Sequence, residues 1–347
     1  MVYAVLPFYL ITVLNSPYIV VGILEGFFEL VSNVIKVFSG YISDFRKKKY
    51  LIAYSFGLSI IGRFYLGFSK KWEDVMIYYL FESVCEGTKT PPIDILLSSK
   101  KKLLGKIFGI NRVFENIGGL TGIFIAFFSS LYFLNEKSDY NIYFLFSVIP
   151  VSIAFILSFL IKEKVSFKRY MKNLSLEIIY PEYLVLFFLL SFASFGYSFY
   201  ILKVYGSTES QGETISLYML FYICLIITSY LSGKFFDFIG EKRFLFICIV
   251  LLFTAHFFMV YFPIIGFLVF AVADAFLDIG VWAILGQKVK FRKGFVFGMY
   301  HFTIGISGLF ASLLAGYLWD NFGSEFPFLM GMFSSFFSFI FYLKILR

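Results

Sequence analysis

The stretch Ser39-Gly-Tyr-Ile-Ser-Asp44 decides the fold, because the chain repeats it as Ser232-Gly-Lys-Phe-Phe-Asp237, 193 residues later. Basic residues follow both copies, at 46–49 and at 242–243. A motif that returns at a fixed distance, followed by the same kind of residue, indicates an internal duplication.

Two further echoes support the duplication. Glu82 and Glu86, four residues apart in an apolar segment, correspond to Asp274 and Asp278 at an offset of 192. A run of glycines at 105, 109 and 119 falls on glycines at 294, 298 and 308 at an offset of 189. Three independent coincidences are improbable, so the sequence predicts two homologous halves.

The composition predicts a polytopic membrane protein. Of the 347 residues, 60% are hydrophobic and 15% are charged, and the mean hydropathy is +0.84. A helix needs about 20 mostly apolar residues to cross the hydrocarbon core. Eleven segments meet this length, at 18–42, 51–69, 75–97, 107–133, 142–161, 183–204, 214–238, 244–262, 264–287, 295–319 and 325–345. The apolar segment Val2 to Leu14 is shorter, and we interpret it as the latter half of a first helix.

The distribution of Lys and Arg predicts the orientation. Most of the 30 basic residues fall in alternate loops and at the C-terminus, and by the positive-inside rule this side is cytoplasmic. The net charge of +8 is then a topology signal, and no nucleic-acid partner is expected.

The polar interval 162–182 would be a cytoplasmic linker between a six-helix bundle at 1–161 and a second at 183–347. Three cysteines, all in predicted spans, imply no disulfide framework.

Two six-helix halves that each carry G-x-x-x-D and a basic cluster after their second helix resemble the major facilitator superfamily of secondary transporters. The resemblance implies an all-α membrane fold with two pseudo-symmetric six-helix bundles. The segments Val5-Leu-Pro7, Glu25-Gly26 with Glu29, Lys36 to Gly40, and Glu86 to Asp94 are similar to a prokaryotic subgroup of predicted efflux permeases. This subgroup resemblance favours export.

The repeated loop motif is a candidate gate. Gly40 and Gly233 would let neighbouring helices approach closely, while Asp44 and Asp237 would meet a helix N-terminus or a basic side chain at the membrane edge. The basic members of the predicted gate are Arg46, Lys242 and Arg243. The alternative is that the aspartates only cap helices and the basic residues only set topology.

Ionisable residues inside predicted spans are candidates for proton coupling, because charge is expensive in hydrocarbon. Glu25 and Glu29 lie one turn apart on a face that Lys36 shares, so the three could form a buried ion network. Glu82 with Glu86, and Asp274 with Asp278, should flank the central pathway from opposite halves. Two carboxylates one turn apart cannot both ionise cheaply, so one of each pair is expected to hold a proton.

The alternative for these carboxylates is neutralisation by a nearby cation, such as Lys89, Arg63 or Arg112. The two histidines add titratable candidates, because His256 corresponds to Arg63 and His301 corresponds to Arg112. A membrane histidine is more often a packing residue, so that interpretation stays open for both. Glu115, three residues after Arg112, completes the set of candidate transport residues.

The sequence holds no pattern typical of an enzyme, a metal site or a bound cofactor. We therefore expect a secondary active transporter of the plasma membrane that works by alternating access and exchanges protons for, or with, a small organic solute. A monomer in the lipid bilayer is expected. Two alternatives remain: a proton-driven importer or passive facilitator of a metabolite, and a receptor or scaffold that has the fold without transport.

Overall fold

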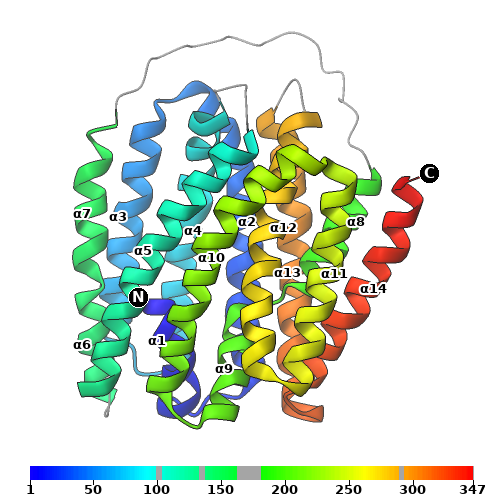
Figure 1. Cartoon of the computed structure of the whole chain (residues 1–347). Coiled ribbons are helices and arrows are strands. Elements are labelled where there is room, and N and C mark those ends of the chain that lie inside the picture. The colour runs from blue at the N-terminus through cyan, green and yellow to red at the C-terminus, as the bar shows by residue number, and fades with distance from the viewer. Residues whose placement is uncertain (99–103, 133–136, 162–180, 289–292, 347) are drawn as a thin grey trace.

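The computed structural model describes residues 1–98, 104–132, 137–161, 181–288 and 293–346, and within these ranges every regular element is helical. The linker predicted at 162–182 lies outside these ranges except for its last two residues, which already belong to a helix. The elements trace twelve passes along one bundle (Figure 1). The first half of the chain gives α1 (Val2–Phe8) with η1 (Tyr9–Val13), α2 (Tyr18–Phe45), α3 (Lys48–Leu66), α4 (Trp72–Ser98), α5 (Leu104–Tyr132), and α6 (Lys137–Phe146) with α7 (Val148–Ser158). The second half gives α8 (Pro181–Ala193) with α9 (Tyr197–Thr208), α10 (Gln211–Ile239), α11 (Glu241–Tyr261), α12 (Pro263–Lys288), α13 (Lys293–Phe322) and α14 (Phe326–Leu346).

The two ends of the bundle differ in charge, and we name them accordingly. The basic end is where α2 meets α3, α10 meets α11, α7 ends and α8 begins; it is uppermost in Figure 1. The opposite end is where η1 meets α2, α9 meets α10 and α13 meets α14. The helices therefore alternate in direction along the chain, as the predicted spans require.

The predicted all-α membrane fold is confirmed. Nine of the described helical segments are long and apolar enough to cross a bilayer, and Val2–Val13 is a shorter apolar helix, as the sequence predicted. The spans predicted at 51–69 and 75–97 form the helices α3 and α4, but these carry more charged residues and are not among the nine. Large apolar side chains are exposed on the outside of the bundle, including Phe238 at 87% and Phe114 at 71%. In a bilayer these side chains contact lipid, while the helices satisfy their own backbone hydrogen bonds.

Two long helix pairs join the first half of the chain to the second. The helix α2 runs antiparallel to α13 along its whole length, and α5 packs similarly on α10. The α2–α13 contact is close at Gly22, where a Cβ atom would overlap the carbonyl oxygen of Ser312. Small residues let helix backbones meet in this way, and in a membrane that packing is a main source of helix association.

Two predicted spans are interrupted. The span expected at 142–161 divides at Ser147 into α6 and α7, and the span expected at 183–204 divides at residues 194–196 into α8 and α9. The second interruption includes Gly196, whose extended backbone (ψ of 137°) begins a new helix at Tyr197. The break exposes helix-terminal N–H groups in the middle of the bundle, where they need partners.

Candidate functional site

The two first-half carboxylates of the repeated pair are both neutralised by cations. Arg63 on α3 contacts Glu82 on α4 at 3.0 Å between Nη2 and Oε1, and Ser59 donates a hydrogen bond of 2.7 Å to the second oxygen. One turn further along α4, Lys89 contacts Glu86 at 2.7 Å. Both glutamates are therefore neutralised by a nearby cation, as the alternative to proton coupling requires.

The cation that neutralises Asp278 comes from the other half of the chain. Arg112 on α5 contacts Asp278 on α12 at 2.5 Å between Nε and Oδ2, and also contacts Glu115 at 2.6 Å. The indole of Trp282 donates a hydrogen bond of 3.1 Å to Asp278. The side chains of Arg112 and Asp278 are 38% and 28% exposed, so this pair joins the two halves at a place that solvent can reach.

Asp274, one turn from Asp278 on α12, has a different environment. The hydroxyl of Tyr197, the first residue of α9, donates to its Oδ2 at 2.5 Å. No Lys, Arg or His within the described ranges lies within ion-pair distance of Asp274. Of the four carboxylates that the repeat relates, Asp274 is thus held by a neutral hydroxyl instead of a cation.

A glutamate from the first half fills the break between α8 and α9. Oε1 of Glu25 on α2 accepts a hydrogen bond of 3.1 Å from the backbone N–H of Ser198 and a second from the Ser198 hydroxyl. Its carboxylate lies where a Cβ atom of residue 196 would be, so glycine at this position makes room for it. Ser312 of α13 accepts a further hydrogen bond of 3.2 Å from the N–H of Gly196.

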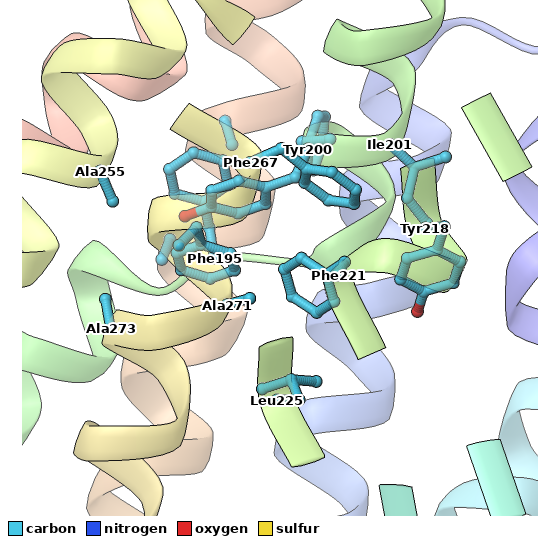
Figure 2. Packing of buried hydrophobic residues seen from close by; sticks show 14 of the residues in the cluster. Phe195, Tyr200, Ile201, Tyr218, Phe221, Leu225, Ala255, Phe267, Ala271 and Ala273 are labelled. Atoms are coloured by element: carbon cyan, nitrogen blue, oxygen red, sulfur yellow. The ribbon is translucent and has the colours of Figure 1, made fainter. Parts of the chain in front are cut away.

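Aromatic rings hold the break in place. Phe195 stacks on Tyr200 with ring centroids 5.1 Å apart, and Tyr200 stacks on Phe270 of α12 at 3.8 Å. Figure 2 shows Phe195 and Tyr200 in this buried cluster, with Phe221 of α10 and Phe267 of α12 beside them. The start of α9 is therefore fixed on α10 and α12 by packing, which also aims Tyr197 at Asp274.

The other predicted members of α2 form no ion pair with a residue of the described ranges. Glu29 accepts a hydrogen bond of 3.0 Å from the side-chain amide of Asn33, and Lys36 donates one of 3.1 Å to the carbonyl oxygen of that amide. His301 of α13 lies 3.0 Å from the same oxygen and packs against Trp282. Asn33 thus links Glu29, Lys36 and His301 across the α2–α13 contact.

His256 is a packing residue in this structure. Its Nδ1 lies 2.6 Å from the carbonyl oxygen of Leu252, so Nδ1 carries the proton, and Nε2 accepts from the hydroxyl of Tyr200 at 3.0 Å. The side chain is fully buried, and a Cβ atom at Gly331 would overlap its ring. The neutral form uses both ring nitrogens, which the packing interpretation requires.

The predicted gate lies at the basic end. Gly233 is buried on α10 and faces Gly109 of α5 from the other half, so a close approach occurs there. Gly40 is also buried, next to Ser39, whose hydroxyl donates a hydrogen bond of 2.8 Å to the Thr88 carbonyl of α4. The side chains of Arg46, Asp237, Lys242 and Arg243 are exposed, and the side chain of Asp44 lies outside the described part of the structure.

Several residues of the site were not predicted from the sequence: Asn33, Tyr197, Ser198, Trp282 and Asp320. The carboxylate of Asp320, near the end of α13, accepts hydrogen bonds of 3.0 and 2.7 Å from the N–H groups of Tyr18 and Ile19, where α2 begins. The Ser-Phe-Gly sequence before Tyr197 is the one signal that could have indicated a helix break there. Within the described ranges, no group of three His, Cys, Asp or Glu could hold a metal ion.

Comparisons with known proteins agree on the family. The sequence model described as Major Facilitator Superfamily matches residues 1–263 and 183–347. An uncharacterised MFS-type transporter of Methanocaldococcus jannaschii is 30% identical over an alignment that covers 95% of this chain and 87% of the relative.

Solved structures of transporters have the same fold. A single-residue mutant of the nucleoside transporter NupG superimposes with a TM-score of 0.78 at 13% identity, covering 99% of this chain and 95% of NupG. The proton:xylose symporter XylE, bound to 6-bromo-6-deoxy-D-glucose, gives 0.77 at 12% identity, with 99% and 92% covered. The human organic anion transporter MFSD10 gives 0.71 at 12% identity, with 92% and 83% covered.

Proposed function

Because the chain belongs to the Major Facilitator Superfamily, a family of transporters and not of enzymes, we propose that it is a proton-coupled secondary transporter of a small organic solute. The observation that supports coupling is the environment of Asp274. The other three carboxylates of the two related pairs, Glu82, Glu86 and Asp278, have cation partners, whereas Asp274 has the hydroxyl of Tyr197. A carboxylate without a cation in a membrane bundle can take up a proton at little electrostatic cost.

The contacts between the halves support alternating access. The Arg112–Asp278 pair and the α2–α13 contact both join the first half to the second, so opening either end requires some of them to separate. Asp274 lies one turn from Asp278 on the same helix. Protonation of Asp274 and formation of the ion pair are therefore expected to influence each other, which would link proton binding to closure.

We further propose that residues 1–161 and 183–347 form the two moving bundles and that the basic end faces the cytoplasm of the plasma membrane. The alternation of basic loops supports this orientation. The protein is proposed to act as a monomer, and export is the proposed direction because of the subgroup resemblance.

The test is proton movement in proteoliposomes. Purified protein is reconstituted with an internal pH dye, and sugars, amino acids, organic acids and lipophilic cations are added in turn. We expect one class of solute to trigger a pH change in the parent protein and none in Asp274→Asn, while Asp274→Asn still exchanges labelled solute. The sign of the pH change separates antiport, expected for export, from symport.

The matched control is Asp320→Asn, which changes an aspartate at the end of α13 that is held by backbone N–H groups. Its coupling should persist, even if its rate falls. A solute that moves without any pH change in the parent protein would support the passive facilitator instead. Undiminished coupling in Asp274→Asn would remove this residue from the mechanism.

A further inference from the structure

Each half of the chain places a carboxylate at a helix N-terminus of the other half. Glu25 of the first half binds the N-terminus of α9 in the second half, and Asp320 of the second half binds the N-terminus of α2 in the first. Both N-termini offer N–H groups that lack a partner within their own helix, together with the positive end of a helix dipole. Each contact therefore attaches one half to the other by the same chemistry.

The Asp320 contact lies at the opposite end, and the Glu25 contact lies between that end and the middle of the bundle. Asp320 binds at the first residues of α2, and Glu25 lies seven residues, or about 10 Å, further along that helix. They differ in exposure, because the hydrogen bonds of Asp320 are exposed whereas Glu25 is 9% exposed. The buried contact is the one that a change of charge will affect most, since water cannot replace its partners.

The described surroundings of Glu25 contain no counter-ion. The titratable groups that interact with it are Glu29 on its own helix, Tyr79 of α4 and Tyr218 of α10. At the break Glu25 meets Ser198 and Gly196, which carry no charge, and α13 places Leu309 and Ser312 beside the neighbouring Gly26 and Gly22 of α2. No described cation is within ion-pair distance. Oε2 is buried without a hydrogen-bond partner among the described residues. The Ser198 donors and the α9 dipole are thus the groups that stabilise an ionised Glu25.

We propose that Glu25 is a proton-operated tie between the halves: ionised, it holds the start of α9 against α2 and keeps the opposite end closed, and protonated, it releases that end. This proposal deepens the proposed function, on which its role in coupling depends. Asp274 would carry the proton that moves with solute exchange, whereas Glu25 is a positioning residue that decides when the opposite end opens. Tyr197, between them, follows α9 when the tie is released.

The physical basis is the difference between a charged and a neutral acceptor. A carboxylate accepts charge-assisted hydrogen bonds that are about twice as strong as neutral ones, and it interacts favourably with the helix N-terminus. A carboxylic acid keeps the hydrogen bonds in weakened form and loses the dipole interaction. Loss of one charge-assisted hydrogen bond is enough to change the ratio of two conformations about tenfold.

The test measures the distance between the halves at the opposite end. Spin labels are placed at two exposed positions, by Glu73→Cys at the start of α4 and Ser207→Cys near the end of α9, with the three native cysteines replaced by alanine. Distance distributions are recorded by pulsed electron paramagnetic resonance in nanodiscs across a pH series that spans neutrality, without added solute. We expect the parent protein to be closed at the alkaline end of the series and to gain a longer distance as the pH falls.

Three variants test the tie. Glu25→Gln should show the longer distance even at alkaline pH, with an open-to-closed ratio about tenfold above that of the parent, and should lose the response to pH. Gly196→Ala leaves the glutamate intact and places a methyl group where its carboxylate lies, so it should give the same result. Ser198→Ala removes one of the two donors and should give a smaller shift that does not add to that of Glu25→Gln.

The control is Glu213→Gln, which removes an exposed carboxylate in the first turn of α10, at the same end of the bundle, whose described hydrogen bonds stay within its own half. Its distance distribution should follow that of the parent. If Glu25→Gln and Gly196→Ala both keep the parent distribution at every pH, the proposal is wrong. A Glu213→Gln result equal to that of Glu25→Gln would also contradict it, because the loss of any negative charge at this end would then suffice.

This experiment is independent of transport. A tie that responds to pH in a protein that moves no protons would overturn the proposed coupling and leave the tie in place. If solute drives proton movement but the Glu25 variants leave the opposite end unchanged, the proposed coupling stands and the tie is wrong.

Discussion

Arg112 and Asp278 form an ion pair of 2.5 Å that joins α5 in the first half of the chain to α12 in the second. The internal repeat gives each of these residues a counterpart in the other half, but it does not relate the two residues to each other. Arg112 corresponds to His301, and Asp278 corresponds to Glu86. The contact is therefore a property of how the two halves face each other, and it can be tested directly.

Breaking this pair should impair transport more than it impairs folding. Arg112→Ala leaves Trp282 as the one described partner of Asp278. We expect this to weaken the association of the two halves by about 1–3 kcal/mol. The loss is smaller than for a fully buried pair because both side chains are partly exposed. The double variant Arg112→Asp with Asp278→Arg should recover part of the transport rate. If the reversed pair is no more active than Arg112→Ala, transport requires the native residue at each position, and an ion pair between the positions is not enough.

Removing the hydroxyl of Tyr197 should change the pH profile of transport. Tyr197→Phe keeps the ring and its packing against Phe270 but deletes the hydrogen bond that Tyr197 donates to Asp274. The ionised carboxylate loses a stabilising partner, so proton release becomes harder and the midpoint of transport activity should move to higher pH. Proton flux recorded across a pH series measures the midpoint. Tyr261→Phe, at an exposed tyrosine at the end of α11, is the control and should leave the midpoint unchanged.

The contact between α2 and α13 should be intolerant of a single methyl group. In Gly22→Ala the new Cβ overlaps the Ser312 carbonyl, and overpacking of this kind costs about 1–3 kcal/mol. Gly206→Ala, on α9, meets no atom within 4 Å and should be neutral or slightly stabilising. Thermal unfolding of the two variants in detergent compares them. Equal midpoints would mean that the helices separate easily at Gly22.

His256 should matter for stability and not for coupling. His256→Ala empties a fully buried site and leaves the hydroxyl of Tyr200 without its acceptor, so we expect a loss of about 2–4 kcal/mol in the free energy of unfolding. The pH dependence of proton flux, scaled to the amount of folded protein, should match that of the parent. A changed profile would return His256 to the coupling residues.

The gate at the basic end remains a prediction that labelling can check. If Asp237 acts as a latch, Asp237→Asn should increase the reactivity of a cysteine introduced at Ser229, which faces α5 near Gly109. The reagent is a membrane-impermeant thiol probe applied from the side of the basic end, on a cysteine-free background. Identical labelling in parent and variant would indicate that Asp237 serves only to cap or to orient the helices.

The sequence predicted the fold well because a membrane helix is a long local signal. Apolar length identified the spans, and the repeat of residues 39–44 at 232–237 identified the two halves without any knowledge of contacts. The break at residues 194–196 was missed because Ser-Phe-Gly within an apolar run does not lower the hydropathy enough to divide it. A long span and two short helices have the same composition.

The site was predicted only as a set of residues, because partners depend on the packing of distant helices. Glu25 and Glu29 were expected to share an ion network with Lys36, since all three lie on one face of one helix. In the structure Glu25 instead contacts Ser198, which is 173 residues away in the sequence. Periodicity along α2 shows which side chains point the same way, but it cannot show which helix they meet.

The α2–α13 contact also has a consequence for biosynthesis. α13 begins about 250 residues after α2 ends. At a synthesis rate of roughly 5–20 residues per second, the ribosome therefore reaches α13 on the order of tens of seconds after it completes α2. Throughout that time Glu29 lacks α13, against which its side chain packs at Gly308 in the finished protein. We expect an insertion chaperone or the translocon to shield α2 until α13 arrives, and ribosome-bound chains stopped before residue 293 should be the ones that crosslink to it.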